Sequence, residues 1–172
     1  MIAIIQYNAG NILSVYNAID RLGYDCIITN DHKKIKDADK VIFPGVGEAF
    51  SSMKYLRSNK LDKLIQNLEQ PVLGICLGMQ LMCNSSEEGP TQCLKIFPND
   101  VVRFKNNDLV PHMGWNNFES ADTKLLKGVK ISDDLYYVHS YYVEVGESTT
   151  AICNYQINFC FSMCKNCGWW PW

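Results

Sequence analysis

Short apolar runs alternate with segments of helical length through the first 83 residues, and this alternation leaves few folds open. The apolar runs are Ile2–Ile5, Cys26–Thr29, Lys40–Phe43 and Pro71–Ile75. Helical spacing of apolar residues fills most of the intervals, while 30–39 is polar and predicts a loop or a short helix. Strands that alternate with helices are joined by right-handed crossovers, which place them in a parallel sheet covered by helices on both faces. The sequence therefore predicts an α/β fold.

The pattern changes from about residue 94 onward. Four short β-type segments separated by turns follow: Val101–Phe104, Trp115–Phe118, Tyr136–Val143 and Thr150–Cys153. Short strands at this spacing predict an antiparallel layer added to the parallel sheet. The 172 residues contain no repeat and no linker, so we expect residues 1–172 to form a single domain.

Composition narrows the possible functions. Hydrophobic residues make up 47% of the chain and the net charge is −2, without a run of lysine or arginine that would neutralise phosphates, so we expect no nucleic-acid partner. The amino terminus lacks a basic region and meets a polar turn early, which argues against a signal peptide or a membrane span. Eight cysteines without an export signal indicate reduced thiols and a cytoplasmic location.

A cysteine stands where the fourth apolar run ends. In Gly74-Ile75-Cys76-Leu77-Gly78 the glycines flank Cys76 with the spacing of a nucleophile elbow, a tight strand-to-helix turn that lifts the central side chain out of the sheet. A helix amino terminus also favours the thiolate. The alternative is a buried structural cysteine at a strand–helix junction.

A second glycine turn, Pro44-Gly45-Val46-Gly47, follows the preceding apolar run. Its backbone N–H groups could face an oxyanion, or it could be a plain tight turn. Glu48 and the lack of a following Gly-Lys-Ser/Thr argue against a phosphate site. A nucleophile and a donor loop at neighbouring strand ends together favour acyl transfer.

These turns belong to a longer series of motifs. Pro44–Gly47, Gly74–Gln80, Pro111–Asn116 and Val138–Tyr142, with the opening turn Tyr7–Asn11, resemble the class I glutamine amidotransferases and, within them, the glutaminase subunits of imidazole glycerol phosphate synthase. The resemblance covers residues 1 to about 159. It implies a flavodoxin-like three-layer α/β fold, with a mainly parallel sheet and an added antiparallel layer.

The resemblance also implies a role for each motif. Cys76 would attack the side-chain amide of glutamine, and the thioester would form as ammonia leaves. Backbone N–H groups near Val46, Gly47 and Leu77 would hold the oxyanion. The remaining implied residues bind glutamine or face a partner: Gln80, Ser140 and Tyr141 for the substrate, and Asn8, Asn11 and Trp115 for the partner interface.

The implied partner is the cyclase subunit of the synthase, with which the chain would form a heterodimer. Ammonia would pass to that subunit, which makes imidazole glycerol phosphate and aminoimidazole carboxamide ribotide in histidine biosynthesis. The resemblance implies no cofactor and no metal. The alternative function is a non-catalytic subunit that binds glutamine or docks on the cyclase.

The chain departs from the family in its proton acceptor. The family takes the thiol proton with the histidine of a late His-Pro-Glu motif, which this sequence does not contain; its histidines are His32, His112 and His139. His139 is the candidate substitute, since it adjoins Ser140. We therefore expect very weak glutamine hydrolysis. We also expect the family's C-terminal strand and helix to be missing, which would uncover an apolar face and a strand edge and make the chain poorly soluble or partner-dependent.

The last thirteen residues, 160–172, are atypical, with three cysteines and three tryptophans. Cys160-x3-Cys164-x2-Cys167 matches a spacing that can hold an iron–sulfur cluster. The alternative is that the reading frame or gene model departs from the family near residue 160. We expect no metal site here.

Overall fold

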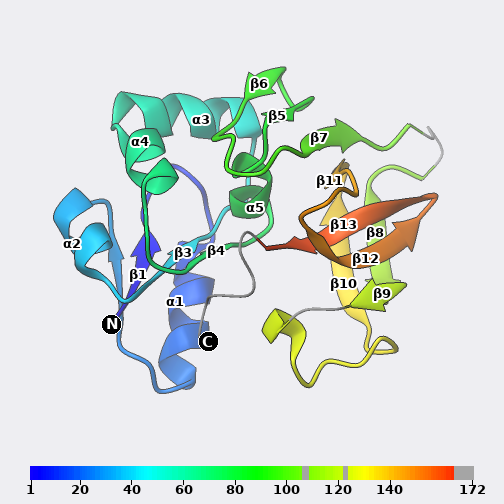
Figure 1. Cartoon of the computed structure of the whole chain (residues 1–172), viewed down its shortest axis with the longest axis horizontal. Helices are drawn as coiled ribbons and strands as arrows, with labels where there is room; N and C mark the ends of the chain where they lie inside the picture. Colours follow the sequence, from blue (N-terminus) through cyan, green and yellow to red (C-terminus); the bar gives the residue numbers. More distant parts are fainter. Residues whose placement is uncertain (106–108, 122–123, 165–172) are drawn as a thin grey trace. The chain divides into compact units, whose positions relative to one another are not determined.

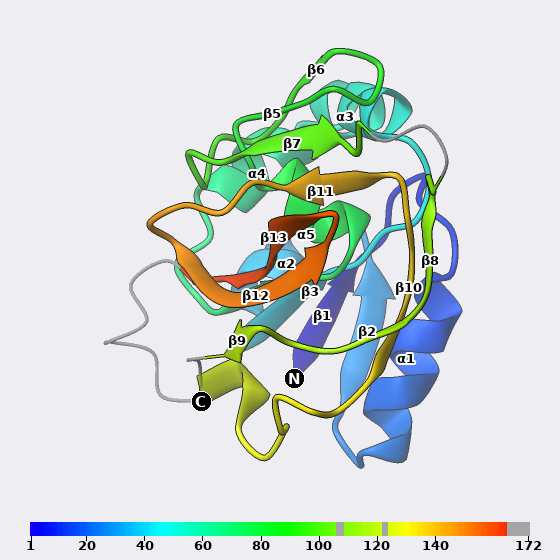
Figure 2. The ribbon, with the colours of Figure 1, turned by 90° about the vertical axis from the view of Figure 1, so that its right-hand side faces the viewer.

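The computed structural model describes residues 1–105, 109–121 and 124–164. The chain divides into two compact units, residues 1–96 and residues 97–172. Figures 1 and 2 show the helices and strands of both units from two directions, coloured in sequence order. In the described part of the chain, no helix has the length and apolar character needed to cross a membrane.

The first unit is built on a four-stranded parallel sheet in the order β2-β1-β3-β4. Its strands are β1 (Ile2–Ile5), β2 (Cys26–Thr29), β3 (Lys40–Phe43) and β4 (Val72–Gly74). The predicted parallel sheet is confirmed, and β4 is the only one of these strands whose ends differ from the expected run. Successive residues of β1 are buried, as expected where both faces of a sheet are covered. Parallel pairing brings the four carboxyl ends to one edge, where sites form in such sheets.

Helices follow the strands of this unit. They are α1 (Ile12–Arg21), α2 (His32–Asp37), α3 (Ala49–Ser58), α4 (Leu61–Gln66) and α5 (Leu77–Leu81). The polar segment 30–39 contains α2 because Asp31 caps it: its carboxylate accepts hydrogen bonds from the N–H groups of Lys33 and Lys34 at 2.8 and 3.0 Å. A short hairpin of β5 (Ser85–Ser86) and β6 (Thr91–Gln92) follows α5.

The apolar face of helix α1 is only partly buried. The stripe Ile12, Val15, Tyr16 and Ile19 is half-buried, and no residue of α1, all of which the structure describes, is fully buried. Leu22, just after the helix, is 69% exposed. The first unit thus keeps apolar surface in contact with water along this helix.

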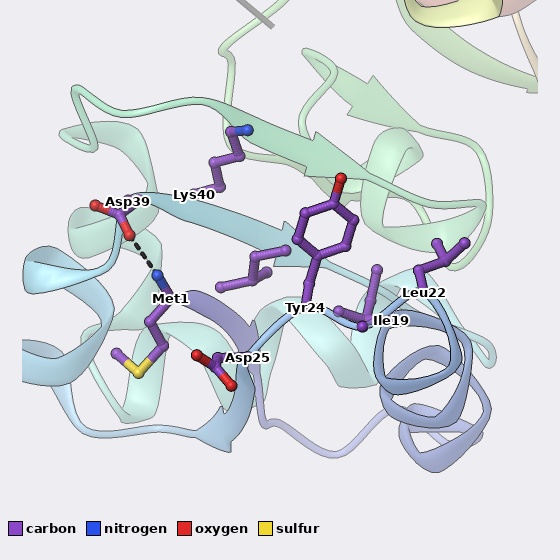
Figure 3. Close-up of a pocket in the computed structure, with 9 residues that line it drawn as sticks. Met1, Ile19, Leu22, Tyr24, Asp25, Asp39 and Lys40 are labelled. Carbon is purple, nitrogen blue, oxygen red and sulfur yellow. Dashed lines mark hydrogen bonds and ion pairs between the residues drawn. The ribbon is translucent and has the colours of Figure 1, made fainter.

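A pocket of about 510 Å³ lies at the amino ends of β1, β2 and β3 (Figure 3). Ile19, Leu22 and Tyr24 give it apolar walls, and the Met1 ammonium pairs with the Asp39 carboxylate at its rim. The pocket opens at the edge of the sheet opposite to the carboxyl ends, where Cys76 lies. It is therefore separate from the predicted site.

The second unit is antiparallel. Its strands are β7 (Asp100–Arg103), β8 (His112–Asn116), β9 (Ser120–Ala121), β10 (Leu135–His139), β11 (Tyr141–Val143), β12 (Thr149–Tyr155) and β13 (Ile157–Met163). Strands β7, β11, β13, β12 and β9 follow one another in one sheet, while β8 and β10 form a separate two-stranded ribbon. A short 3-10 helix, η1 (Lys124–Leu126), lies between β9 and β10. The predicted antiparallel layer is confirmed.

All four expected strands of this unit have different bounds in the structure: Val101–Phe104 is shifted by one residue to β7, Thr150–Cys153 is extended to β12, and the other two differ more. The expected strand Trp115–Phe118 begins earlier and is β8, His112–Asn116. The expected single strand Tyr136–Val143 is divided at Ser140, because β10 pairs with β8 whereas β11 pairs with β7 and β13. Residues 136–143 therefore contribute strands to two different sheets.

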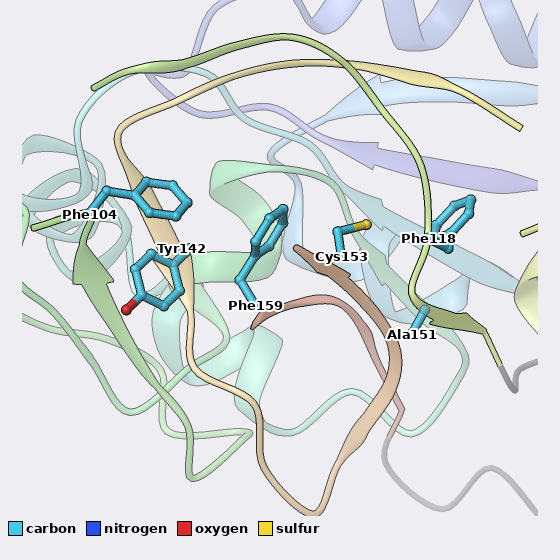
Figure 4. Packing of buried hydrophobic residues seen from close by; sticks show 6 residues of the cluster. All are labelled: Phe104, Phe118, Tyr142, Ala151, Cys153 and Phe159. Carbon is cyan, nitrogen blue, oxygen red and sulfur yellow. The ribbon is translucent and has the colours of Figure 1, made fainter. Parts of the chain in front are cut away.

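An aromatic core fills the second unit (Figure 4). Its buried members are Phe104, Phe118, Tyr142, Ala151, Cys153 and Phe159. Cys160, in β13, is also buried, so the first residues of the atypical tail belong to a packed strand. Cys167, the third cysteine of the expected cluster spacing, lies outside the described residues.

Candidate active site

Cys76 sits at the turn between β4 and α5. Its φ and ψ are 52° and −114°, a combination that residues with a side chain rarely adopt and that stores roughly 1–3 kcal/mol of strain. The turn is held by the Ile75 N–H, which donates to the Phe43 carbonyl at 3.0 Å, and by the Gly78 N–H, which donates to the Ile75 carbonyl at 2.9 Å. Cys76 is exposed. These features are those of a nucleophile elbow.

The two glycines of the elbow allow α5 to approach the sheet. A Cβ on Gly78 would lie 1.8 Å from the Phe43 carbonyl oxygen, and a Cβ on Gly74 would lie 2.8 Å from the Met79 backbone. Only residues without a side chain fit at both places. The Gly-x-Cys-x-Gly spacing therefore has a steric cause in this fold.

The Pro44–Gly47 turn lies against this elbow. A Cβ on Gly45 would come within 3.3 Å of the Gly78 nitrogen, and 2.2 Å from the Tyr7 hydroxyl. Tyr7 is buried and donates a hydrogen bond to the Pro44 carbonyl at 2.6 Å. Gly47 has a φ of 125°, a conformation that favours glycine. Tyr7, which follows the end of β1, thus fixes the start of the predicted oxyanion loop next to α5.

The electrostatic environment of Cys76 favours the neutral thiol. Partial loss of hydration raises its pKa, and the negative charge of Glu88 raises it further, while a hydrogen bond from the Leu77 N–H acts in the opposite direction. The Cys76 thiol is therefore protonated at neutral pH. A nucleophilic thiolate at this site requires a proton acceptor.

Glu88 is a site residue that the sequence reasoning missed. Its Oε2 accepts a hydrogen bond from the Ala49 N–H at 2.9 Å, at the amino terminus of α3. Desolvation raises the pKa of the half-buried Glu88 carboxyl, and the Ala49 hydrogen bond opposes this shift. Glu88 comes from the loop between β5 and β6, and nothing in the run Ser-Ser-Glu-Glu-Gly pointed to Cys76.

The structure brings together part of the predicted set. Cys76, Leu77 and Gln80 share one elbow and helix, with the Gln80 N–H donating to the Cys76 carbonyl at 3.0 Å, and Gly45 brings the Val46–Gly47 loop beside them. Ser140 and Tyr141 are half-buried residues of the second unit, where β10 gives way to β11.

The predicted partner-facing residues lie in both units. Asn8 and Asn11 are exposed in the first; the Asn8 side chain donates to the Ser51 carbonyl, and Asn11 precedes α1 with a left-handed backbone. Trp115 lies on β8 of the second unit and is 71% exposed. Within its own unit, each of the three side chains is therefore exposed and accessible to a partner protein.

Comparisons with known proteins agree with this geometry. Residues 3–163 match the family described as "Glutamine amidotransferase class-I". A relative from Bacteroides thetaiotaomicron, "Imidazole glycerol phosphate synthase subunit HisH", is 53% identical over 157 residues, covering 90% of this chain and 80% of its own length. The chain belongs to the HisH family of class-I glutamine amidotransferases.

A HisH protein from Haemophilus influenzae is 45% identical over 166 residues, covering 95% of this chain and 83% of its own length. Among solved structures, a "Crystal structure of glutamine amidotransferase" has a TM-score of 0.65 with 15% identity, covering 92% of this chain and 87% of that one. The predicted HisH-type glutaminase family and the predicted class I fold are therefore both confirmed.

A substitution of Glu88 tests the electrostatics of the site. Glu88→Gln keeps an acceptor for the Ala49 N–H and removes the charge that raises the pKa of Cys76. We expect the Cys76 pKa to fall and iodoacetamide to alkylate Cys76 severalfold faster at pH 7.5, as followed by peptide mass spectrometry. Glu87→Gln, an exposed neighbour, serves as the control. An unchanged alkylation rate in Glu88→Gln would mean that Glu88 does not act on the thiol.

Proposed function

We propose that this chain is the glutaminase subunit of an imidazole glycerol phosphate synthase and releases ammonia from glutamine with Cys76 as nucleophile. The observation that carries the proposal is the exposed, strained Cys76 at the elbow, with the Leu77 N–H directed at its sulfur. HisH relatives bear the name of this synthase subunit. We further propose that both units form one glutamine amidotransferase domain, since the family match at residues 3–163 extends across both.

In the proposed reaction, the Cys76 thiolate attacks the γ-carbonyl carbon of glutamine. The carbonyl oxygen becomes an oxyanion, to which the N–H of Leu77 and those of Val46 and Gly47 donate. The C–N bond then breaks, the nitrogen takes a proton from the solvent water that received the thiol proton and leaves as ammonia, and a thioester remains on Cys76. Water attacks the thioester, releasing glutamate and restoring the thiol.

Substrate binding is assigned to groups from both units. Gln80, one turn beyond Cys76 on α5, and the Ser140–Tyr141 segment bind glutamine in this proposal. Glu88 pairs with the α-ammonium group of glutamine, because its carboxylate is half-buried and acts on Cys76. Neutralising Glu88 in this way also removes a charge that raises the Cys76 pKa, so substrate binding favours the thiolate.

The proton of Cys76 has no assigned acceptor among the histidines. His32 Nε2 lies 3.1 Å from the Asn59 carbonyl oxygen and so donates to it. His112 and His139 hydrogen-bond to each other. With the thiol protonated at neutral pH and no His-Pro-Glu in the sequence, we propose that this chain hydrolyses glutamine very slowly.

The partner is proposed to dock on the outer face of the β8–β10 ribbon. Alternate residues of the two strands point outward and are all more than half exposed: Met113 (60%), Trp115 (71%), Tyr136 (55%) and Val138 (59%). Trp115 lies directly opposite Tyr136, and Met113 opposite Val138, so the four form one contiguous apolar face. We propose that the cyclase subunit covers this face, and also contacts Asn8 and Asn11, in a cytoplasmic heterodimer.

Trp115→Ala is expected to weaken binding of the cyclase subunit by about 30-fold, the loss of a central aromatic contact. Isothermal titration calorimetry with the purified cyclase measures the change. Val145→Ala, which truncates an exposed apolar residue outside the ribbon, is expected to bind as the unaltered chain does. Equal affinities of Trp115→Ala and the unaltered chain would rule out the ribbon as the interface.

A non-catalytic subunit is the second candidate, favoured by the missing His-Pro-Glu. Ammonia release in the presence of the cyclase separates the two: a rate above that of Cys76→Ala supports the glutaminase. A complex on size-exclusion chromatography without Cys76-dependent ammonia supports the docking subunit. Neither complex nor ammonia would contradict both.

A further inference from the structure

Two histidines meet on the inner face of the β8–β10 ribbon, outside the chemistry assigned above. His112 of β8 lies opposite His139 of β10, and its Nδ1 is 2.8 Å from the His139 Nε2. The His139 Nδ1 in turn lies 2.9 Å from the Tyr141 carbonyl oxygen. The contacts form one chain from β8, through both rings, to the backbone of β11.

The acceptor at the end of this chain fixes the protons. A carbonyl oxygen only accepts, so the His139 Nδ1 carries a hydrogen and donates to Tyr141. The neutral His139 ring then has a lone pair on Nε2, and the His112 Nδ1–H donates to it. The Nδ1–H tautomer of His139 therefore satisfies both contacts, and the hydrogen bond from His112 further stabilises it.

The surroundings keep both rings neutral and in place. His112 is 3% exposed, and the rings of Tyr137 and Tyr155 stack nearly parallel to it, with centroid distances of 4.9 and 3.9 Å. Phe104 and Phe159 contact the edges or faces of both histidine rings. Burial lowers the pKa of His112 to about 4 and also lowers that of His139, so neither is protonated at neutral pH.

The chain of hydrogen bonds through the two histidines ends at Ser140–Tyr141, the segment to which glutamine binding is assigned. His139 holds the Tyr141 carbonyl, and the Phe104 N–H donates to the Ser140 carbonyl at 3.1 Å, so two successive carbonyls of this segment are fixed. This segment is the point where the chain leaves the ribbon for the larger sheet, so these two hydrogen bonds add to the pairing of β10 with β8 and of β11 with β7 on either side of it.

We propose that His112 and His139 are positioning residues that fix the backbone of Ser140 and Tyr141 for glutamine binding. The proposal rests on the proposed function in one respect, the assignment of this segment to the substrate. In this proposal neither histidine contacts the substrate or the reacting atoms.

Paired substitutions separate the hydrogen bonds from simple packing. His112→Phe keeps an aromatic ring between the tyrosines and removes the donor, whereas His112→Asn places an amide nitrogen near the Nδ1 position. His139→Leu and His139→Asn make the same comparison at the second ring. Glutamine affinity is measured by calorimetry on the full chain, and exchange of the Phe104 amide hydrogen is measured by NMR.

We expect His112→Phe and His139→Leu to bind glutamine about tenfold more weakly and to exchange the Phe104 amide faster, while both asparagine variants stay close to the unaltered chain. Asparagine variants that behave as their apolar counterparts do would overturn the proposal. If the unaltered chain binds no glutamine, the proposed function fails, and the amide exchange alone decides the positioning role. If His112→Phe does not fold, the His139 pair gives the same decision.

Discussion

Ammonia release from glutamine by this chain is expected to be slow at pH 7 and to rise about tenfold per pH unit toward pH 9, because only the thiolate attacks and its fraction grows in that proportion below the pKa. The pKa of Cys76 lies above the ordinary thiol value of 9.0, so the rise continues to at least pH 9. Initial rates of ammonia formation at glutamine concentrations well below saturation, which report the pKa of the free chain, are measured from pH 6.5 to 9.5 with and without the cyclase to test this expectation.

Cys76→Ala is the control, and its ammonia release should not exceed the buffer blank at any pH. A rate that levels off near pH 7 would contradict the expectation. Such a profile requires a base that titrates near neutrality and accepts the thiol proton, and would show that a group in the chain or its partner replaces the missing histidine.

The second large effect is a loss of stability in mild acid caused by His112. Its pKa is lowered from 6.5 to about 4 in the folded chain, chiefly by burial and also by His139, so the unfolded chain binds the proton more readily. The stability that neutral His112 confers is therefore complete above about pH 6.5 and is lost as the pH falls to about 4. A shift of this size corresponds to about 3 kcal/mol in the free energy of unfolding. Urea unfolding at pH 7 and pH 4.5 measures the loss.

His112→Phe is the matched variant for this measurement, since it keeps the stacked ring and cannot be protonated. Asp31 and Asp39 also have lowered pKa values, so some acid destabilisation remains in any variant. The difference between the two chains reports on His112. An equal loss of stability in both would show that His112 is not responsible.

The local parts of the fold were predictable from the sequence. The strands of the parallel sheet are short apolar runs closed by turns, and the elbow at Cys76 follows from glycine spacing after a strand, since both depend on neighbouring residues. The division of residues 136–143 at Ser140 was not predictable in this way. An unbroken β-type run contains no sign that its two halves pair with different strands.

Contacts between segments that are distant along the chain could not be predicted from the sequence pattern either. Glu88 and Tyr7 act near Cys76 although they are 12 and 69 residues away from it along the chain, and only the folded backbone brings them there. The hydrogen bond between His112 and His139 depends on the register of β8 with β10. The register between two strands depends on the packing of the whole unit and not on the residues next to each histidine.

Covalent labelling of Cys76 tests the central claim most directly. A glutamine analogue with a chloroketone in place of the side-chain amide alkylates a thiol that lies where the amide carbon would bind. Intact mass and peptide mapping are expected to show one adduct, on Cys76, that forms more slowly in the presence of free glutamine and is absent in Cys76→Ala. Labelling that glutamine does not slow, or that falls on another cysteine, would contradict the assignment of Cys76 as the glutaminase nucleophile.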